Sequence, residues 1–300
     1  MKKILINGCG GMLGDAFYKV YNSKYNLLCT DIDLNSDWLK YLDFRDFDAY
    51  KKIVEDFKPD YIFHIGAYTS LEFCETNVED TYLTNYFSVE NAVLLSNKNN
   101  IPLIFISTAG IFDGKKDVYN DWDMPNPISY YTKSKFMAEE YIQKNCSKYY
   151  IFRAGWMMGG GEKKDKKFIY KIIKQIADGN TKLNIVNDKS GTPTYTIDFV
   201  KNIDLVIQTG FYGLYNLVCE GETSRMEVAK EIVKILNMQD KINIQEVESN
   251  YFSKEYFAKR PLSEKLINLK LNLRNLNTMR NWKVCLSEYI NEYYSKYISK

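Results

Sequence analysis

The sequence of 300 residues contains a single histidine, His64, and six dispersed cysteines without a C-x-x-C pair. Zinc sites need clustered Cys and His ligands, so we expect no metal. No secretory signal is visible, and we therefore expect free, buried thiols rather than disulfides. The cysteines are Cys9, Cys29, Cys74, Cys146, Cys219 and Cys285.

Long apolar runs and a strong net charge are also missing. The first apolar run, Ile4–Ile6, is too short for a signal peptide, and no run approaches the length of a membrane span. The formal net charge is only +2, which gives no electrostatic reason to bind nucleic acid or a membrane surface. We expect a cytoplasmic protein with neither as a partner.

Short apolar segments alternate with amphipathic stretches, which predicts an α/β fold: a Rossmann-type, doubly wound parallel sheet. The pattern loosens near Met157. We predict a dinucleotide-binding domain over 1–155, and a smaller C-terminal α/β substrate-binding lobe over 156–300 that partly returns to it. The predicted strands are Lys3–Ile6, Leu27–Thr30, Tyr61–Ile65, Leu103–Ser107, Tyr150–Arg153 and Leu183–Val186. The predicted helices are Gly14–Tyr21, Tyr50–Phe57, Tyr131–Ile142, Phe168–Asp178 and Val228–Leu236, the last capped by Ser224.

A glycine-rich turn follows the first predicted strand and opens a helix. Gly8, Gly11 and Gly14 have the spacing G-x-x-G-x-x-G, and Gly10, Met12 and Leu13 complete the segment. Such a turn lets backbone N–H groups and a helix N-terminus approach a pyrophosphate, although an ordinary glycine turn has the same composition.

Asp31 ends the second predicted strand, where an acid can bind the adenosine ribose hydroxyls. A carboxylate there repels a 2′-phosphate, and no Arg or Lys follows closely. NADH is therefore favoured and NADPH is not excluded. Asp33 is an alternative ribose partner, and Asp31 is alternatively a simple turn residue.

Tyr131 and Lys135 lie four residues apart in a predicted helix and so share one face. A nearby ammonium lowers a tyrosine pKa, and such a tyrosine can protonate a carbonyl oxygen as hydride reaches the carbon. Thr108 ends the preceding strand, where its hydroxyl could hold the same oxygen. In a chain with 25 tyrosines this spacing also arises by chance.

Ten segments match a known pattern over nearly the whole chain. They are Ile6–Gly14, Asp43-Phe44, Lys58–Thr69, Asn85, Ser107–Gly114, Asn126–Lys135, Arg153–Trp156, Gly191–Thr194, Gly221–Ser224 and Ala258–Pro261. Together they resemble the extended short-chain dehydrogenase/reductase family, and more narrowly its dTDP-4-dehydrorhamnose reductase branch of sugar-nucleotide reductases.

The resemblance implies an NAD(P)H-dependent oxidoreductase acting on a nucleoside-diphosphate keto sugar in nucleotide-sugar and surface-polysaccharide biosynthesis. It implies the catalytic residues Thr108, Tyr131, Lys135 and Asn85. It implies cofactor contacts from the glycine turn and Asp31, and from Ile32, Asp43, Phe44, Gly66, Ala67, Tyr68, Tyr131 and Lys135. It implies substrate contacts from Thr69, Thr108, Ala109, Trp156 and Arg260. Core packing is an equal alternative for Trp156, as is a purely structural role for Arg260.

The chain departs from the branch beside the expected sugar. Thr108-Ala109-Gly110 stands where the branch usually has Thr-Asp-Tyr, and the segment Arg153–Gly161 is unusual. Because Ala109 replaces an acid, dehydration is disfavoured. An epimerase of the same superfamily and a non-catalytic, dinucleotide-binding regulatory subunit are the alternatives, and a homodimer is possible. We expect His64 to be a core residue. For Glu72 and Glu75 we favour a solvated helix start over sugar binding.

Overall fold

A seven-stranded sheet forms the first lobe, and all its strands run parallel in the order β12-β7-β5-β4-β1-β2-β3. The computed structural model describes residues 1–297. The strands are β1 (Lys3–Asn7), β2 (Asn26–Asp31), β3 (Leu39–Tyr41), β4 (Tyr61–His64), β5 (Leu103–Thr108), β7 (Tyr149–Ala154) and β12 (Gly213–Asn216). The predicted doubly wound sheet is confirmed.

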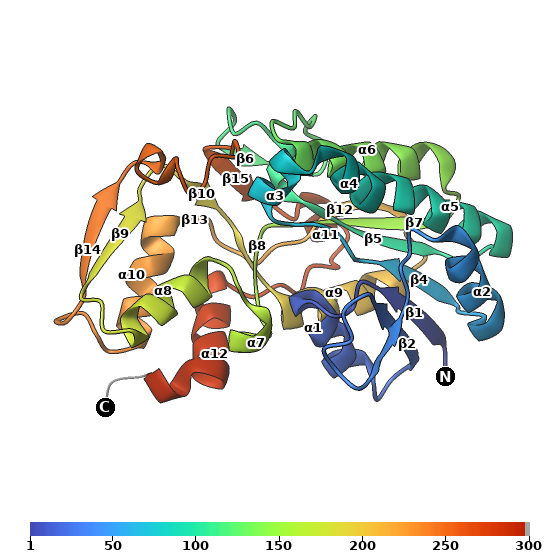
Figure 1. Ribbon diagram of the computed structural model, residues 1–300, viewed down its shortest axis with the longest axis horizontal. Coiled ribbons are helices and arrows are strands. Elements are labelled where there is room, and N and C mark those ends of the chain that lie inside the picture. The colour runs from blue at the N-terminus through green and yellow to red at the C-terminus, as the bar shows by residue number, and fades with distance from the viewer. Residues whose placement is uncertain (298–300) are drawn as a thin grey trace.

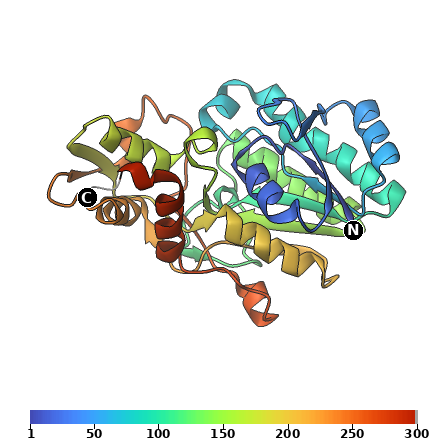
Figure 2. The same cartoon turned by 90° about the horizontal axis from the view of Figure 1, so that it is seen from below.

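Helices cover both faces of this sheet (Figure 1). Neighbouring residues of a strand point to opposite faces: Ile4 and Ile6 join one apolar cluster and Leu5 joins the other. The helices on the first face are α1 (Met12–Tyr21) and α9 (Thr196–Ile207), which lie side by side (Figure 2). The helices on the second face are α2 (Phe47–Phe57), α5 (Ser88–Asn99) and α6 (Tyr130–Asn145).

Local signals set the ends of these helices. Asp46 caps α2 by accepting a hydrogen bond from the Ala49 N–H at 3.0 Å, and α2 stops at Lys58, whose φ is +52°, directly before Pro59. Ser224 Oγ caps α10 (Arg225–Ile235), as predicted, by accepting from the Glu227 N–H at 3.2 Å. The predicted helices and strands are found, with ends displaced by up to three residues.

The second lobe has its own small sheets, but it shares an apolar core with the first. One buried cluster runs from Phe17 of α1 to Ile172 of α8 and Ile232 of α10. The main elements of the second lobe are α8 (Phe168–Ala177), α10, α12 (Trp282–Tyr294), and the parallel pair β9 (Lys182–Val186) and β14 (Asn243–Val247). The shorter strands are β6 (Val118–Tyr119), β8 (Trp156–Met158), β10 (Ser190–Gly191), β11 (Pro193–Tyr195), β13 (Thr223–Ser224) and β15 (Ser263–Leu266). The short helices of both lobes are α3 (Leu71–Thr76), α4 (Val78–Tyr82), α7 (Gly161–Lys164), α11 (Leu269–Leu273), and the turns η1 (Leu83–Phe87), η2 (Ala109–Ile111), η3 (Ser249–Phe252) and η4 (Ser295–Tyr297). Of these, α3, α4 and η1 pack against α6 of the first lobe.

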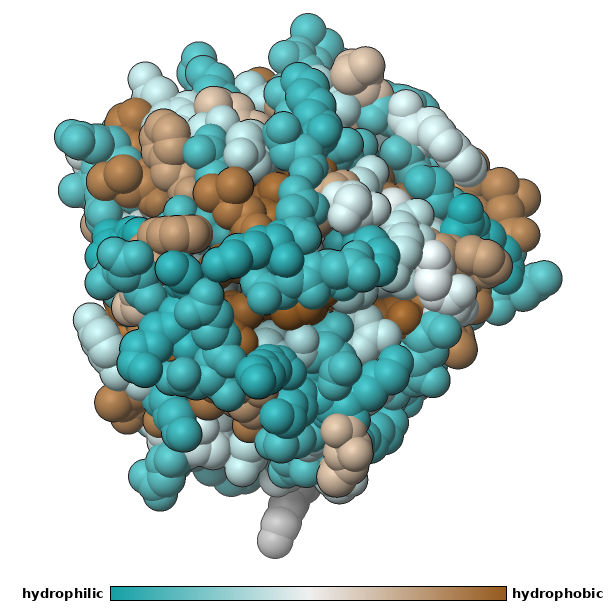
Figure 3. Space-filling view, turned by 90° about the vertical axis from the view of Figure 1, so that its right-hand side faces the viewer, coloured by the Kyte–Doolittle hydropathy of each residue, from teal (hydrophilic) through white to brown (hydrophobic). Residues whose placement is uncertain are grey.

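Residues beyond 156 also complete the first lobe, because β12 pairs with β7 and α9 packs against α1. The domain boundary at residue 155 stays a prediction. The face of the first lobe turned away from the second is mostly hydrophilic, with its apolar side chains in small groups (Figure 3). Among residues 1–297, no helix combines the length and apolarity needed to cross a membrane. All six cysteines are free and buried, which confirms that prediction.

A buried ion pair fastens α6 to the sheet. Arg153 of β7 donates to both carboxylate oxygens of Glu139 at 2.7–3.2 Å, and their side chains are 4% and 0% exposed. The Arg153 guanidinium also lies 5.3 Å from the centre of the Phe112 ring, next to η2. The pair therefore joins the helix, the sheet and the turn after β5.

Replacing one partner should be strongly destabilising. Arg153→Met leaves the Glu139 carboxylate buried without a partner, and we expect the free energy of unfolding to fall by about 3–5 kcal/mol. Urea unfolding measures this change. The control is Lys144→Met on the same helix, whose ion pair with Glu140 is exposed and should contribute less than about 1 kcal/mol. Equal losses in the two variants would contradict the role given to the buried pair.

Candidate active site

A cleft of about 1640 Å³ opens between the lobes at the carboxyl ends of β1, β2, β4 and β5, where ligands bind in open α/β sheets. Most of the predicted site residues line it: Gly8, Gly11, Met12, Leu13, Gly14, Asp31, Ile32, Asp43, Phe44, Gly66, Ala67, Tyr68, Thr69, Thr108, Tyr131, Lys135, Trp156 and Arg260. Three do not. Gly10 is buried against Asp31 and Asn35, and Asn85 and Ala109 are each 1% exposed in the interior.

The glycine turn is shaped for a close backbone approach. Gly8 has φ +81°, and a Cβ there would lie 2.0 Å from the Cα of Gly66 at the end of β4. A Cβ on Gly14 would lie 2.0 Å from the carbonyl oxygen of Cys9. Gly11 has open space beside it, and no side chain caps the N-terminus of α1. The first N–H groups of α1 are thus free for a phosphate, which fits a dinucleotide.

Asp31 at the end of β2 lies against this turn. Its carboxylate accepts from the Gly10 N–H at 2.8 Å and from the Asp33 N–H at 3.0 Å. Asp33 itself is exposed and does not line the cleft.

Lys164 of α7 reaches the same turn from the second lobe, and sequence reasoning missed it. Its ammonium donates to the Gly10 carbonyl at 2.7 Å and to the side-chain oxygen of Asn35. Asn35 in turn donates to the Gly10 carbonyl at 3.2 Å. Gly10 and Lys164 are 154 positions apart in the chain, so no local pattern shows that a cation stands here.

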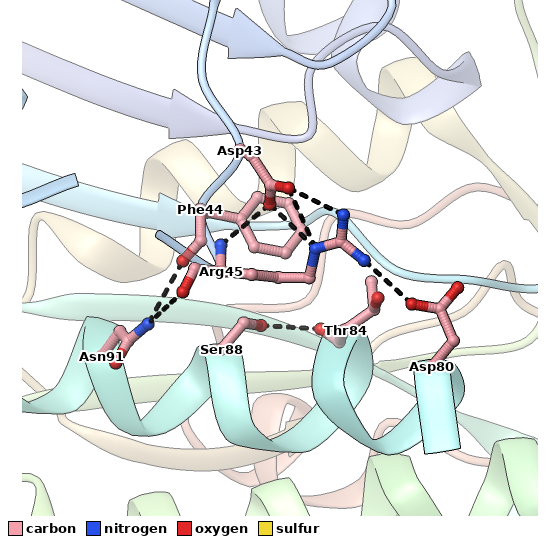
Figure 4. Close-up of polar contacts among 7 residues, drawn as sticks. All are labelled: Asp43, Phe44, Arg45, Asp80, Thr84, Ser88 and Asn91. Atoms are coloured by element: carbon pink, nitrogen blue, oxygen red, sulfur yellow. Dashed lines mark hydrogen bonds and ion pairs between the residues drawn. The ribbon is translucent and has the colours of Figure 1, made fainter. Parts of the chain in front are cut away.

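The segment that resembles the adenine-contacting pair is held by an arginine (Figure 4). Arg45 donates through Nε and Nη2 to Asp43 at 2.7–3.0 Å, and through Nη1 to Asp80 at 2.9 Å. The Arg45 guanidinium keeps the pKa of Asp43 below its usual range. Asn91 of α5 donates to the backbone carbonyls of Phe44 and Arg45 at 3.3–3.4 Å. The loop is therefore fixed before any ligand binds.

His64 is a core residue, as predicted. It is fully buried, its Nε2 lies 3.1 Å from Ser88 Oγ, and its ring packs against Phe44. Burial lowers the pKa of His64 to about 3, so the imidazole is neutral at physiological pH.

Asn85 lies in the π-helical turn η1, a feature often found at functional sites. Its amide accepts from the Tyr68 N–H at 2.8 Å, and donates to the Tyr68 carbonyl at 3.0 Å and to Ser134 Oγ at 3.2 Å. It therefore fastens the turn after β4 to helix α6. The water-mediated support of Lys135 that we expected stays a prediction.

Helix α6 brings Tyr131 and Lys135 into the cleft one turn apart. Ser129 and Thr132 form a reciprocal capping box that fixes where the helix begins. The hydroxyl of Thr108 at the end of β5 accepts from the Gly110 N–H at 3.2 Å and lies near enough to Tyr131 to lower its pKa. The three side chains of the predicted catalytic group are thus close together.

The pKa of Tyr131 differs from the sequence-based expectation. Burial raises it above its ordinary value and outweighs the lowering effect of Thr108. Lys135 is not among the groups that lower it in this structure. The Lys135 side-chain nitrogen lies 3.8 Å from the centre of the Phe105 ring. Burial lowers the pKa of Lys135 itself to about 7, and the nearby Glu139 opposes this shift.

The second lobe supplies an aromatic and charged wall. The Trp156 ring lies between the Arg225 guanidinium, 3.6 Å from the ring centre, and Gly191, where a Cβ would come within 2.3 Å. Its indole N–H donates to Glu264 at 2.7 Å. Arg225 and Glu264 were not predicted. Arg225 directly follows the recognised cap Ser224, which could have drawn attention to it.

The two remaining predicted substrate residues, Arg260 and Ala109, have different surroundings. Arg260 pairs with Glu72 of α3 at 2.7 Å across the cleft, so Glu72 is not simply a solvated helix start. Glu75 accepts from the Tyr130 N–H at 2.9 Å. Ala109 packs into the core with Phe112, and Gly110 lines the cleft instead. The small Ala109 side chain faces inward because η2 turns the chain there.

A parallel sheet of this order, a glycine turn after its first strand and a Tyr-x-x-x-Lys helix beside the cleft define an extended short-chain dehydrogenase/reductase. The family model described as "RmlD substrate binding domain" matches residues 1–295, and the chain belongs to that family. The resemblance seen in the sequence is confirmed.

Relatives and solved structures agree with this assignment. A dTDP-4-dehydrorhamnose reductase of Aggregatibacter actinomycetemcomitans is 30% identical over 73% of this chain and 74% of its own length. The spore coat polysaccharide biosynthesis protein SpsK of Bacillus subtilis is 26% identical over 97% and 98%. A dTDP-4-dehydrorhamnose reductase structure from Clostridium acetobutylicum has a TM-score of 0.88 at 29% identity, covering 97% and 99%. One from Bacillus anthracis, in complex with NADP, has a TM-score of 0.88 at 27% identity, covering 97% and 100%.

Removal of the buried cation should stabilise the unliganded protein. Because the pKa of Lys135 is about 7 folded and 10.5 in the reference state, the unfolded chain binds more protons between these values, and stability rises with pH there. We expect Lys135→Met to raise the free energy of unfolding by about 1 kcal/mol or more near pH 7. The gain should shrink toward pH 10.5.

Urea unfolding at several pH values measures this difference. The control is Lys133→Met, an exposed lysine two positions earlier on the same helix, which should change stability little at any pH. A Lys135→Met variant that is less stable than the native protein at pH 7 would show that burial of the ammonium does not lower the free energy of unfolding.

Proposed function

We propose that the protein is an NAD(P)H-dependent reductase of a nucleoside-diphosphate-linked keto sugar, similar to the dTDP-4-dehydrorhamnose reductases, and that it reduces C4 of the hexose. The observation that carries this proposal is the meeting of Thr108, Tyr131 and Lys135 in a cleft that also contains the glycine turn and Trp156. The role lies in nucleotide-sugar and surface-polysaccharide biosynthesis, as the name of the SpsK relative suggests. A cytoplasmic location and a homodimer remain predictions.

The chain's own residues provide proton transfer and orientation. The bound dinucleotide supplies the hydride. Tyr131 is protonated at neutral pH, since its ordinary pKa is 10.0 and burial raises it further, so it can donate its proton to the carbonyl oxygen. Thr108 orients that oxygen. Lys135 would hold the nicotinamide ribose. When the cleft is filled, Lys135 also stabilises the phenolate that proton donation leaves on Tyr131.

Cations in the second lobe suit the substrate diphosphate. Arg225, Lys167, Lys189 and Arg260 line the same part of the cleft. Guanidinium groups bind phosphate oxygens in a fork, which favours the two arginines. Since Glu72 already balances the charge of Arg260, we propose Arg225 as the main diphosphate contact, with Arg260 beside it.

Asp31 and Lys164 oppose each other in the choice of cofactor. The Asp31 carboxylate favours free ribose hydroxyls, and hence NADH. The Lys164 ammonium, on the same Gly10 peptide region, can balance a 2′-phosphate. The NADP-bound relative supports acceptance of the phosphorylated form in this family. We propose that NADH is preferred and that Lys164 makes NADPH acceptable.

Lys164→Ala tests this balance. We expect kcat/KM for NADPH to fall roughly tenfold, because a charge-assisted contact is lost, and kcat/KM for NADH to change little. Asp31→Asn should shift the ratio toward NADPH. Steady-state kinetics with each cofactor, with the exposed Lys163→Ala as the control, measures both effects. A parallel loss for the two cofactors in Lys164→Ala would refute a selective role.

Tyr131→Phe tests the reaction itself. We expect loss of turnover by about 10²–10⁴-fold, with fold and dinucleotide binding retained. The assay follows oxidation of NADH and NADPH against a panel of nucleotide-linked keto sugars that includes the dTDP-4-keto-6-deoxyhexoses. Tyr130→Phe, the neighbouring partly exposed tyrosine, is the matched control.

The same assay separates the alternatives. Dinucleotide binding with no oxidation across the panel would favour an epimerase or a regulatory subunit over a reductase. Native-like turnover in Tyr131→Phe would refute the assignment of the proton donor.

A further inference from the structure

The turn after β5 leaves a gap in the wall of the reacting centre, and a carboxylate from another part of the chain fills it. Strand β15 contacts η2, and the Glu264 side chain of β15 points to Gly110. A Cβ on Gly110 would lie 3.2 Å from Glu264 Oε1 and 3.5 Å from Thr108 Oγ1. Thus the small, uncharged turn noted in the sequence does not make this part of the cleft uncharged.

Only one carboxylate oxygen of Glu264, Oε2, has a hydrogen-bond partner among the described residues. Its Oε2 accepts the indole N–H of Trp156 at 2.7 Å. Parallel pairing of β15 with β10 sets Glu264 opposite Gly191, on which the Trp156 ring packs. Among the hydrogen bonds of the described residues, none engages Oε1. The carboxylate is therefore oriented, and one oxygen is left for a ligand.

Glu264 interacts with positively charged side chains of the second lobe on one side and with Tyr131 on the other. Lys167, Lys189 and Arg225 interact with it electrostatically from the second lobe and balance its negative charge. On the other side it acts on Tyr131, whose pKa is raised mainly by burial and further by the charge of Glu264. Glu264 thus lies between the proposed diphosphate contacts and the proposed proton donor.

We propose that Glu264 accepts a hydrogen bond from the sugar hydroxyl next to the keto carbon, and so selects keto sugars in which that hydroxyl is free. This inference rests on the proposed function. Thr108 and Tyr131 hold the oxygen at C4, and C5 of a 6-deoxyhexose carries a methyl group. The neighbouring hydroxyl is therefore the one at C3.

An ionised carboxylate can only accept hydrogen bonds. An analogue without the C3 hydroxyl leaves Oε1 unpaired in a filled cleft, and such loss discriminates strongly between substrates. Positions 109 and 110 of the turn after β5 are Ala and Gly, and the carboxylate beside Gly110 comes from Glu264. Glu264 is thus a specificity residue particular to this combination of turn and strand.

The test compares a nucleoside-diphosphate-linked 4-keto-6-deoxyhexose with its 3-deoxy counterpart in native protein, Glu264→Gln and Glu264→Ala. We expect the native protein to prefer the hydroxylated sugar by roughly 10- to 100-fold in kcat/KM. Glu264→Ala should lose most of that preference, and Glu264→Gln part of it, because an amide can still hydrogen-bond a hydroxyl. The preference is the ratio of the two kcat/KM values, so an effect of the lost Trp156 contact that is common to both sugars cancels. Glu222→Gln is the control, since Glu222 pairs with Lys265 and does not line the cleft.

Calorimetric binding of the two sugar nucleotides is the second measurement and does not depend on turnover. A preference in affinity that disappears in Glu264→Ala supports the inference even if no cofactor is oxidised, in which case only the proposed reaction fails. If Glu264→Ala weakens both sugars equally, Glu264 only supports Trp156 and the inference is overturned. A native protein that binds both sugars equally well would overturn it too. Thermal melting and NAD(P)H binding show whether each variant is folded. If one of Glu264→Gln and Glu264→Ala is misfolded, the other is used for the comparison.

Discussion

The buried pair of Arg153 and Glu139 is the interaction on which the geometry of the site depends. Tyr131, Lys135 and Glu139 follow one another at four-residue steps along α6, so a shift of the helix at Glu139 would move the other two. Its arginine comes from the strand beside β5, which carries Thr108. Because charge and hydrogen-bond geometry must both be satisfied in the interior, the pair allows one position of α6 on the sheet.

The same pair affects the electrostatics of the cleft. The Glu139 carboxylate opposes the loss of charge on Lys135 that burial causes. With Lys135 near neutrality and Tyr131 firmly protonated, the unliganded site stores its proton on the tyrosine. The second lobe adds a negative charge at Glu264 and several positive ones around it. Tyr131 and Lys135 thus face the reacting centre from the sheet side, and Glu264 with its surrounding cations faces it from the second lobe.

The parts predicted from the sequence are those with a local signal. Buried strands such as Tyr61–His64, the glycine turn and the Tyr131–Lys135 step depend on spacing within a few residues. The parts that were missed depend on contacts between distant segments. Lys164, Arg225 and Glu264 are ordinary charged residues in the sequence, and only folding brings them to Gly10, Trp156 and Gly110. The strand β3 was missed because three residues, two of them exposed, carry no periodic pattern.

The expected pKa of Tyr131 was wrong for a related reason. Spacing shows that Lys135 shares a face with Tyr131, but it does not show that the ammonium rests on the Phe105 ring or that burial dominates. Likewise, the sequence shows that Ala109 follows Thr108 without showing that η2 turns it into the core.

The return of β12 and α9 to the first lobe has a consequence for how the chain is made. Synthesis proceeds from the N-terminus, and domains tend to fold as they emerge. Here the edge of β7 has no partner, and the α1 face of the sheet has no α9, until residue 216 has left the ribosome. The first lobe therefore cannot finish folding when residue 155 emerges, and the growing chain carries an open sheet edge until β12 has been translated.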